Sequence, residues 1–357
     1  MHNRVDWTRS FAAAIKTVEE LHTFLGWEAG PGVTSAHASF PVFVPVALAE
    51  KIKAQGPSGP LAKEFLPHSD EVDPRLNSQG LTDPIGDRSY QRAPQLIHRY
   101  PSRALFTATS VCPVHCRYCF RRNELSHGDE LFSGQFSETL SYLRAHPEVS
   151  EIIFTGGDPL TLSNEKLDRY LMAFGEISSI KDVRFHTRYP VILPERIDDG
   201  FIELLRKASS HFRTVSVAIH ANHSSEFDPQ NTEAIRKLAA SPVQLLSQTV
   251  LLKNVNDNSS DLIELINTFI GLKIRPYYLH HPDRVRGGMH FYLSLETGRR
   301  IYQSLRSSLP GWAVPLYVVD IPGGHGKVSA FNPEATAFSG QLLSQSGESI
   351  YVSEPGL

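Results

Sequence analysis

The sequence predicts an α/β fold, a partial (β/α)6 barrel of the TIM-barrel type. From about residue 103 onward, short β-prone segments alternate with longer amphipathic helical segments. Strands that alternate with helices indicate βαβ units and a parallel sheet. A second observation favours a barrel over a doubly wound sheet, because polar residues follow each strand candidate. Loops after successive barrel strands converge on one mouth, whereas a doubly wound sheet gathers its ligands at one switch point.

The six strand candidates are short runs that span 104–110, 151–157, 182–187, 214–220, 243–252 and 274–280. The helical segments between them span 136–146, 164–174, 200–207, 231–240 and 261–271. The groups capable of chemistry lie at the strand ends, and they are a cysteine loop, the GGDP segment, Thr187 with Arg188, His220, Gln248 and the HHPD segment at 280–283. We therefore expect these groups to face one site.

Residues 1–100 precede the predicted barrel and carry helical stretches at 11–25 and 46–54, separated by Gly- and Pro-rich segments. We expect an N-terminal helical cap over these residues, the barrel over 101–300 and a C-terminal segment over 301–357. No internal repeat or low-complexity tract interrupts this organisation.

Composition and charge exclude several classes of protein. The chain has 357 residues, 41% of them hydrophobic, and a formal net charge of −3, so it has no electrostatic footprint of a nucleic-acid binder. No apolar run approaches the ~20 residues of a membrane-spanning helix. The first 22 residues form an amphipathic pattern in which charges interrupt any apolar signal region. We expect a cytoplasmic protein.

The cysteines form a cluster of their own. Cys112, Cys116 and Cys119 are the three cysteines of the chain, and they lie within SVCPVHCRYCFRR. A secreted disulfide scaffold spreads more cysteines along the chain. A Cys3His zinc site with His115 or another histidine as the fourth ligand is one alternative, but no second Cys or His pair follows at zinc-finger spacing. Three thiolates at C-x3-C-x2-C fit three corners of a [4Fe–4S] cluster and leave one iron open, so we favour iron–sulfur.

A second candidate site lies in VPLYVVDIPGGHGKVSAF at 314–331, where a strand-like run reaches Asp320, then a Gly-rich turn and Lys327. Glycines let backbone N–H groups approach an anion. A lysine beside them in an apolar setting could have its pKa lowered enough for Schiff-base chemistry. The turn is no Walker A loop, because the spacing is short and Val328 stands where Ser or Thr would bind Mg²⁺. A surface turn with a solvated lysine is the alternative.

These motifs together resemble a known family. CPVHCRYCFRR, FTGGDPL, HTRYPVILPERI, QTVLLKNVND, RPYYLH and VVDIPGGHGK occur in the order in which they occur in the lysine 2,3-aminomutase family of radical S-adenosylmethionine enzymes. The resemblance runs from about residue 40 to the closing SEP. It implies a radical S-adenosylmethionine barrel and an isomerase that carries a [4Fe–4S] cluster, S-adenosylmethionine and pyridoxal 5′-phosphate (PLP).

The resemblance also implies roles for residues that bind these cofactors. The three cysteines would hold the cluster, and S-adenosylmethionine would occupy the open iron. Its site would be lined by Gly156, Gly157, Asp158, Pro159, Thr187, Arg188, His220 and Gln248. Lys327 matches the lysine that binds PLP covalently, and this makes it the catalytic lysine. The PLP phosphate would meet Arg99, Tyr100 and Arg103 of HRYPSR, although both arginines could instead pair with acids of the N-terminal cap.

The resemblance likewise implies which residues bind the substrate. Arg121 matches the arginine that pairs with the substrate carboxylate, and Asp283 and Asp320 match two aspartates that grip the side-chain ammonium of lysine. A guanidinium pairs bidentately with a carboxylate, and two carboxylates offset one buried ammonium, so the chemistry agrees with these roles. His280 and His281 we expect to be supporting or packing residues.

The implied reaction is a 1,2-amino shift that converts L-lysine to β-lysine, started by a 5′-deoxyadenosyl radical that abstracts a hydrogen from the β-carbon. The implied partners are the amino acid substrate, a reductant such as flavodoxin or ferredoxin, and further copies of the chain in a homo-oligomer, with no nucleic acid and no membrane.

Several alternatives stay open. His325 replaces a glycine of the long catabolic enzymes, and HHPDRVRGGMHF is closer to the short subgroup that supplies β-lysine for elongation factor P. The intact VVDIPGGHGK instead resembles the long enzymes. The same chemistry could act on arginine, ornithine or glutamate, and a PLP-free radical enzyme acting on RNA or a peptide is the alternative from another class.

Overall fold

A ten-stranded sheet organises the molecule. The computed structural model describes residues 6–125, 135–331, 341–343 and 348–351. The strands neighbour one another in the order of the sequence, from β1 to β10. They are β1 (Gln91–Ala93), β2 (Leu96–Tyr100), β3 (Arg103–Thr109), β4 (Glu151–Gly156), β5 (Asp182–Thr187), β6 (Thr214–His220), β7 (Gln244–Val250), β8 (Arg275–His280), β9 (Leu316–Ile321) and β10 (Gly326–Ser329).

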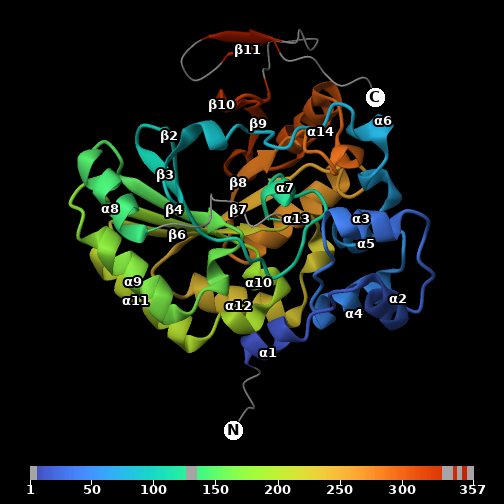
Figure 1. Cartoon of the computed structure of the whole chain (residues 1–357), viewed down its shortest axis with the longest axis horizontal. Helices are drawn as coiled ribbons and strands as arrows, with labels where there is room; N and C mark the ends of the chain where they lie inside the picture. Colours follow the sequence, from blue (N-terminus) through green and yellow to red (C-terminus); the bar gives the residue numbers. More distant parts are fainter. Residues whose placement is uncertain (1–5, 126–134, 332–340, 344–347, 352–357) are drawn as a thin grey trace.

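Seven consecutive strands, β3 to β9, pair in parallel, while β1, β2 and β10 add antiparallel edges. Parallel neighbours need crossover connections, and helices supply them on the outside of the sheet (Figure 1). These helices are α7 (Arg122–Leu125), α8 (Phe136–Ala145), α9 (Asn164–Gly175), α11 (Asp199–His211), α12 (Pro229–Ala239), α13 (Ser259–Gly271) and α14 (Leu295–Ser308). The predicted α/β partial barrel with six β/α repeats is confirmed, and β9 adds a seventh parallel strand.

The buried strands explain why the prediction succeeded. A parallel sheet is covered on both faces, so its strands are nearly continuous apolar runs. Phe154, Phe185 and Val217 on neighbouring strands are completely buried. The predicted strands at 182–187 and 214–220 match β5 and β6, whereas the run at 243–252 is trimmed to the seven residues of β7. The short strands β1, β2 and β10 were not predicted, because three to five residues carry too little periodicity.

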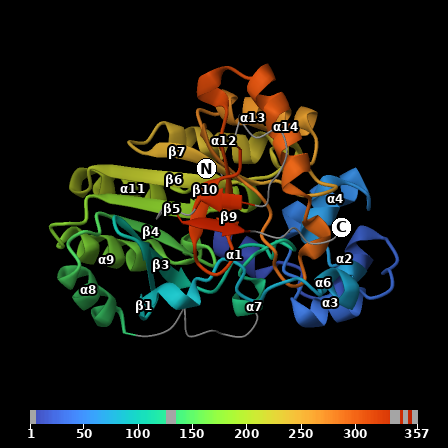
Figure 2. The same cartoon turned by 90° about the horizontal axis from the view of Figure 1, so that it is seen from above.

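The N-terminal residues form short helices, and all but the first of them gather on the side of the sheet opposite α8 and α9 (Figures 1 and 2). They are α1 (Trp7–Ala12), α2 (Val18–Leu25), α3 (Val33–Ser39), α4 (Val46–Gln55), α5 (Pro60–Phe65) and α6 (Pro74–Asn77). The continuous helix expected over 11–25 is wrong. Ile15 pairs with Val44 through two backbone hydrogen bonds, and a capping box between Thr17 and Glu20 then starts α2.

The C-terminal part of the chain completes the sheet and adds a hairpin. Strand β9 leads through a Gly-rich turn into β10, and β11 (Gln341–Leu343) pairs with β12 (Ser349–Tyr351) above the main body (Figure 1). Among the described helices, none has the length and apolarity needed to cross a bilayer.

Candidate active site

One cavity opens at the carboxyl ends of the parallel strands, where the sequence places its polar groups. The last residues of four strands line it, namely Gly156, Thr187, His220 and His280. It also gathers Cys112, Cys116, Cys119, Gly157, Asp158, Arg188, Gln248, Arg99, Tyr100, Arg103, Arg121, Asp283, Asp320 and Lys327. Of the expected site residues, Pro159 is the one that does not line it, because it begins a short 3-10 helix behind Asp158.

The cysteine loop enters the cavity between β3 and α7. Among the described residues, the ligand atoms of His98, His146 and Glu148 all lie within 4.8 Å of one another. The three cysteine sulfurs do not meet this limit, so at least one pair of them is farther apart. A single tetrahedral zinc ion would bring its sulfurs to about 3.8 Å from one another. The three sulfurs are therefore not gathered at the spacing of a single zinc site. Burial raises the pKa of Cys119 to about 12, so metal loading must displace its thiol proton.

His115, the alternative zinc ligand, turns away from this loop. Its Nδ1 lies 2.8 Å from the carbonyl oxygen of Pro41, and its ring stacks on Phe40 at a centroid distance of 4.7 Å. It does not line the cavity. The structure therefore does not bring His115 together with the three cysteines, and this ring packs the loop against the N-terminal helices instead.

The loop is held from behind by a buried ion network. Arg117 Nη2 donates to Glu71 at 2.5 Å, and Arg122 Nη2 donates to the same carboxylate oxygen at 2.6 Å. The backbone N–H of Arg117 donates to Glu64 O at 2.8 Å. Removing one partner from such a buried network leaves an uncompensated charge. These contacts join the cysteine loop to the N-terminal helices.

The GGDP segment shapes the floor beside the cysteines. Gly156 has a φ of +113°, and a Cβ on Gly157 would lie 2.4 Å from the carbonyl oxygen of Val111. The Asp158 carboxylate accepts hydrogen bonds from Thr187 Oγ1 at 2.8 Å and from the Arg188 backbone N–H at 2.7 Å. Asp158 therefore ties the end of β4 to the end of β5 and fixes the turn on which Arg188 sits.

Arg188 links the cysteine loop to buried carboxylates. Its Nη1 lies 3.1 Å from Cys116 Sγ, and its Nη2 donates to Glu226 at 2.5 Å and to Glu64 at 3.2 Å. Burial, together with the neighbouring Glu226 charge, raises the pKa of Glu64 to about 8. A hydrogen-bond donor at a cluster-ligating sulfur is one of the features that set cluster potentials.

Two histidines that line the cavity are hydrogen-bonded to neighbouring side chains. Tyr118 Oη lies 2.8 Å from His220 Nε2, and Gln248 Nε2 lies 3.0 Å from His280 Nε2. Burial lowers the pKa of both imidazoles well below the usual value. His281 instead packs outside the cavity, with its Nδ1 2.8 Å from Tyr317 Oη, as expected of a supporting residue.

Lys327 and Asp320, which both line the cavity, form an ion pair. Burial lowers the pKa of Lys327, but the charge and hydrogen bond of Asp320, together with nearby Tyr100 and Asp283, outweigh burial and raise that pKa above the usual value. The expected lowering is therefore wrong for the chain without ligands, because the sequence does not reveal that Asp320 lies opposite the lysine. Tyr100 Oη accepts from the Lys327 backbone N–H at 2.8 Å and so fixes the start of β10.

Asp283 completes an acidic pair with Asp320. Burial and the neighbouring Asp320 charge raise the pKa of Asp283 to about 8, despite the opposing effect of Lys327. A further cation beside this pair would favour the ionised form of Asp283.

Two arginines meet a carboxylate that sequence reasoning missed. Arg99 Nη2 donates to Asp87 Oδ1 at 2.7 Å, and Arg121 Nη2 donates to Asp87 Oδ2 at 2.5 Å. Arg121 also donates to Glu124 at 3.2 Å. Of the two arginines expected at a phosphate, Arg99 thus pairs with an N-terminal acid, while Arg103 stacks over the ring of Tyr100 at 3.9 Å. Asp87 lies in a Gly- and Pro-rich segment, where the D-P-x-G pattern at 83–86 predicts a turn but does not indicate that Asp87 binds arginines.

The residues present fit the implied cofactors. The buried Nε atoms of Arg99 and Arg121 and the Nε2 of His186 have no hydrogen-bond partner among the described residues, and all three side chains line the cavity. Buried donors of this kind are expected to have partners, so a polar ligand is missing from their surroundings. Two guanidinium donors suit anionic groups such as a phosphate and a carboxylate.

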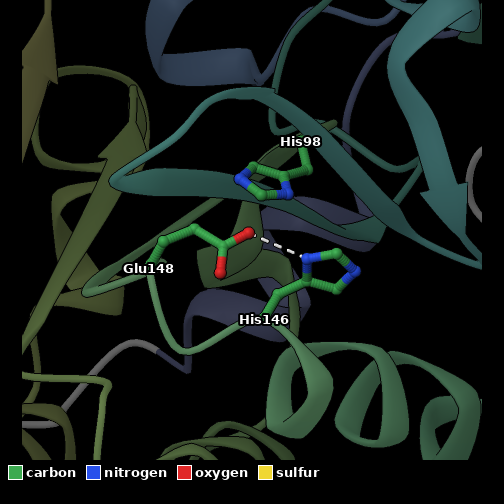
Figure 3. Close-up of side chains that lie close together, drawn as sticks. All are labelled: His98, His146 and Glu148. Carbon is green, nitrogen blue, oxygen red and sulfur yellow. Dashed lines mark hydrogen bonds and ion pairs between the residues drawn. The ribbon is translucent and has the colours of Figure 1, made fainter.

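A second cluster of potential metal ligands lies outside the cavity. Figure 3 shows His98 from β2 with His146 and Glu148, which follow α8, pointing toward one another. Their polar atoms already have protein partners: His146 Nδ1 lies 2.8 Å from Glu148, and His98 Nδ1 lies 2.9 Å from Tyr142 Oη. Glu148 is 47% exposed, so this trio is explained as a surface hydrogen-bond network.

Comparison with known proteins agrees with this site. The Radical SAM superfamily profile matches residues 106–266, from β3 into α13. The chain is 36% identical to the L-lysine 2,3-aminomutase of Haemophilus influenzae over 82% of this chain and 85% of that protein. It is 33% identical to the Escherichia coli protein of the same name over 91% and 94%, respectively. The Clostridium subterminale protein of that name is 33% identical over 90% of this chain and 77% of its own length.

Proposed function

The chain belongs to the lysine 2,3-aminomutase family of radical S-adenosylmethionine enzymes, and from this membership we propose that it converts L-lysine to β-lysine with PLP as a second cofactor. Membership makes the chain an isomerase. The substrate and the need for PLP are the proposal. The observation that carries it is that one cavity contains the three cysteines, Lys327 and the Asp283–Asp320 pair.

The cysteines and the residues around them would hold the radical-generating cofactors. Cys112, Cys116 and Cys119 would bind three irons of a [4Fe–4S] cluster, and S-adenosylmethionine would lie between them and the ends of β4 to β7. When bound, the cluster with S-adenosylmethionine supplies a carbon radical, and PLP supplies a conjugated ring through which an amino group can migrate. Arg188 would keep its donor at Cys116 Sγ because Glu226 and Glu64 hold its other nitrogen.

Lys327 would bind PLP covalently. Its Nζ must lose a proton before it can attack a carbonyl carbon. Asp320 Oδ2, which pairs with Nζ, is the adjacent acceptor for that proton. The phosphate would lie near Arg103 and the free Nε–H of Arg99, which flank Tyr100 on the strands β2 and β3. Tyr100 also accepts a hydrogen bond from the backbone N–H of Lys327. The segment around Tyr100 would therefore position both the phosphate and the lysine that binds the other end of PLP.

The substrate would be held at its two charged ends. Arg121 would bind the carboxylate, and Asp283 with Asp320 would bind the side-chain ammonium, which is costly to bury without partners. A glutamate side chain would instead be repelled by this acidic pair. Apolar side chains such as Phe291 and Leu252 line the cavity and would exclude water from the reacting atoms.

Product analysis tests the proposal. The protein is reconstituted anaerobically with iron, sulfide and PLP, then given S-adenosylmethionine and dithionite with lysine, arginine, ornithine or glutamate. We expect β-lysine from lysine by mass spectrometry. A β-product from another amino acid would keep the chemistry and reject the role of the acidic pair. Accumulation of 5′-deoxyadenosine without any β-product would reject the assigned reaction.

A further inference from the structure

Asp87 joins the two arginines that the proposed function assigns to different anionic groups. It is 1% exposed and lies in the turn before β1. One of its oxygens accepts from Arg99 and the other accepts from Arg121, at 2.7 and 2.5 Å. A single carboxylate therefore fixes the spacing between the two guanidinium groups.

Each arginine keeps a donor that faces no protein acceptor. The Nε–H groups of Arg99 and Arg121 are buried and have no partner within the described part of the chain, and both side chains line the cavity. Asp87 occupies one Nη of each guanidinium. A planar guanidinium is rigid, so the contacts at its Nη atoms, with Ile85 O for Arg99 and Glu124 for Arg121 beside Asp87, also constrain the direction of the remaining N–H.

The turn that carries Asp87 is itself firmly held. The Asp83 carboxylate accepts from the backbone N–H groups of Gly86, Asp87 and Arg88 at 2.9, 3.0 and 3.1 Å. Gly86 has a φ of +72°, and a Cβ there would lie 2.5 Å from the backbone nitrogen of Gly324. The turn thus packs against the Gly-rich segment that leads to Lys327, so Asp87 is placed relative to that lysine as well.

We infer that Asp87 is a positioning residue that sets Arg99 and Arg121 at the spacing needed to bind the PLP phosphate and the substrate carboxylate at the same time. This inference rests on the proposed function. Asp87 also offsets the two buried positive charges, for one of which, Arg121, Glu124 is a second partner. Glu124 offers a matched comparison, because it contacts Arg121 at 3.2 Å and, within the described part of the chain, forms no hydrogen bond or ion pair with Arg99.

The test compares Asp87→Asn with Glu124→Gln in the reconstituted enzyme. The PLP dissociation constant is measured by absorbance titration, and KM and kcat for lysine are measured anaerobically. We expect Asp87→Asn to raise both the PLP dissociation constant and the KM for lysine, each roughly tenfold, as for a lost charged hydrogen bond. Glu124→Gln should raise the KM and leave the PLP dissociation constant within about twofold. Asp87→Glu, which keeps the charge, should recover part of both losses.

Several results would overturn the inference. An unchanged PLP dissociation constant in Asp87→Asn would show that Arg99 does not depend on Asp87. A lower KM would show that Asp87 competes with the substrate carboxylate rather than positioning its partner. If Asp87→Asn loses iron and melts early, Asp83→Asn replaces it, and the same paired loss is expected at a smaller size. A wild-type protein that binds no PLP would instead reject the proposed function, and the inference with it.

Discussion

Lys327 on β10 lies directly opposite Asp320 on the antiparallel strand β9, and their side chains form an ion pair inside the cavity. The Gly-rich turn between the strands sets this register, since Gly323, Gly324 and Gly326 all have a φ near +85°. The ammonium group of Lys327 is therefore paired with Asp320, the same carboxylate that we propose binds the side-chain ammonium of the substrate. Covalent use of Lys327 would release Asp320 for the substrate.

Replacing Lys327 by Ala should abolish the visible absorbance of covalently bound PLP and the formation of β-lysine. The physical reason is that no other lysine lines the cavity among the described residues. Iron content should stay unchanged, because the cysteines belong to the loop after β3. Absorbance spectra and iron analysis of the variant and the wild type check both statements. Persistent absorbance would place the PLP attachment elsewhere.

Replacing Cys116 by Ala should remove most of the iron. Anaerobically reconstituted wild-type protein should carry about four irons per chain and a cluster spectrum, because three cysteines at this spacing ligate three corners of a [4Fe–4S] cluster. PLP binding should survive the substitution, since Lys327 belongs to β10 and not to the cysteine loop. Metal analysis that found one zinc per chain would favour the zinc alternative.

The sequence was sufficient to predict the barrel and the groups at its strand ends, because a buried parallel strand is an apolar run and its carboxyl end is marked by a change to polar residues. The position of Asp87 could not be predicted in this way. It reaches Arg99 and Arg121 through the folding of a turn, and no periodic pattern encodes that contact. The pairing of Lys327 with Asp320 likewise depends on strand register, which sequence separation alone does not give.

Gly157→Ala should loosen the cysteine loop through a clash with its backbone. The new Cβ would lie 2.4 Å from the carbonyl oxygen of Val111, and backbone cannot move aside as a side chain can. We expect a loss of about 1–3 kcal/mol in the free energy of unfolding and reduced iron retention. Gly311→Ala is the control, because nothing lies within 4 Å of its Cβ position. Equal stability and iron content in the two variants would contradict this account of the loop.

The binding of lysine should strengthen as the pH rises toward 8. Burial and Asp320 raise the pKa of Asp283 to about 8 in the ligand-free chain, and the ionised carboxylate is the form that binds an ammonium. Below that pH, binding must first remove a proton from Asp283, so KM should increase by up to about tenfold for each unit of decrease in pH. KM measured from pH 6.5 to 8.5 checks the slope.

Asp283→Asn separates this effect from the ionisation of the substrate itself. The amide cannot titrate, so any slope that remains in the variant belongs to other groups, including the α-amine of lysine, while the difference between the two profiles belongs to Asp283. We expect the variant to have a higher KM at pH 8 and a flatter profile below it.

The Asp283→Asn variant should also be more stable than the wild type at pH 8 when no substrate is added. An acid whose pKa is higher in the folded state than in the unfolded state binds more protons when folded, so its contribution destabilises the fold as pH rises from about 4 to 8. Parallel KM profiles with equal melting temperatures would show that Asp283 is already ionised in the free enzyme.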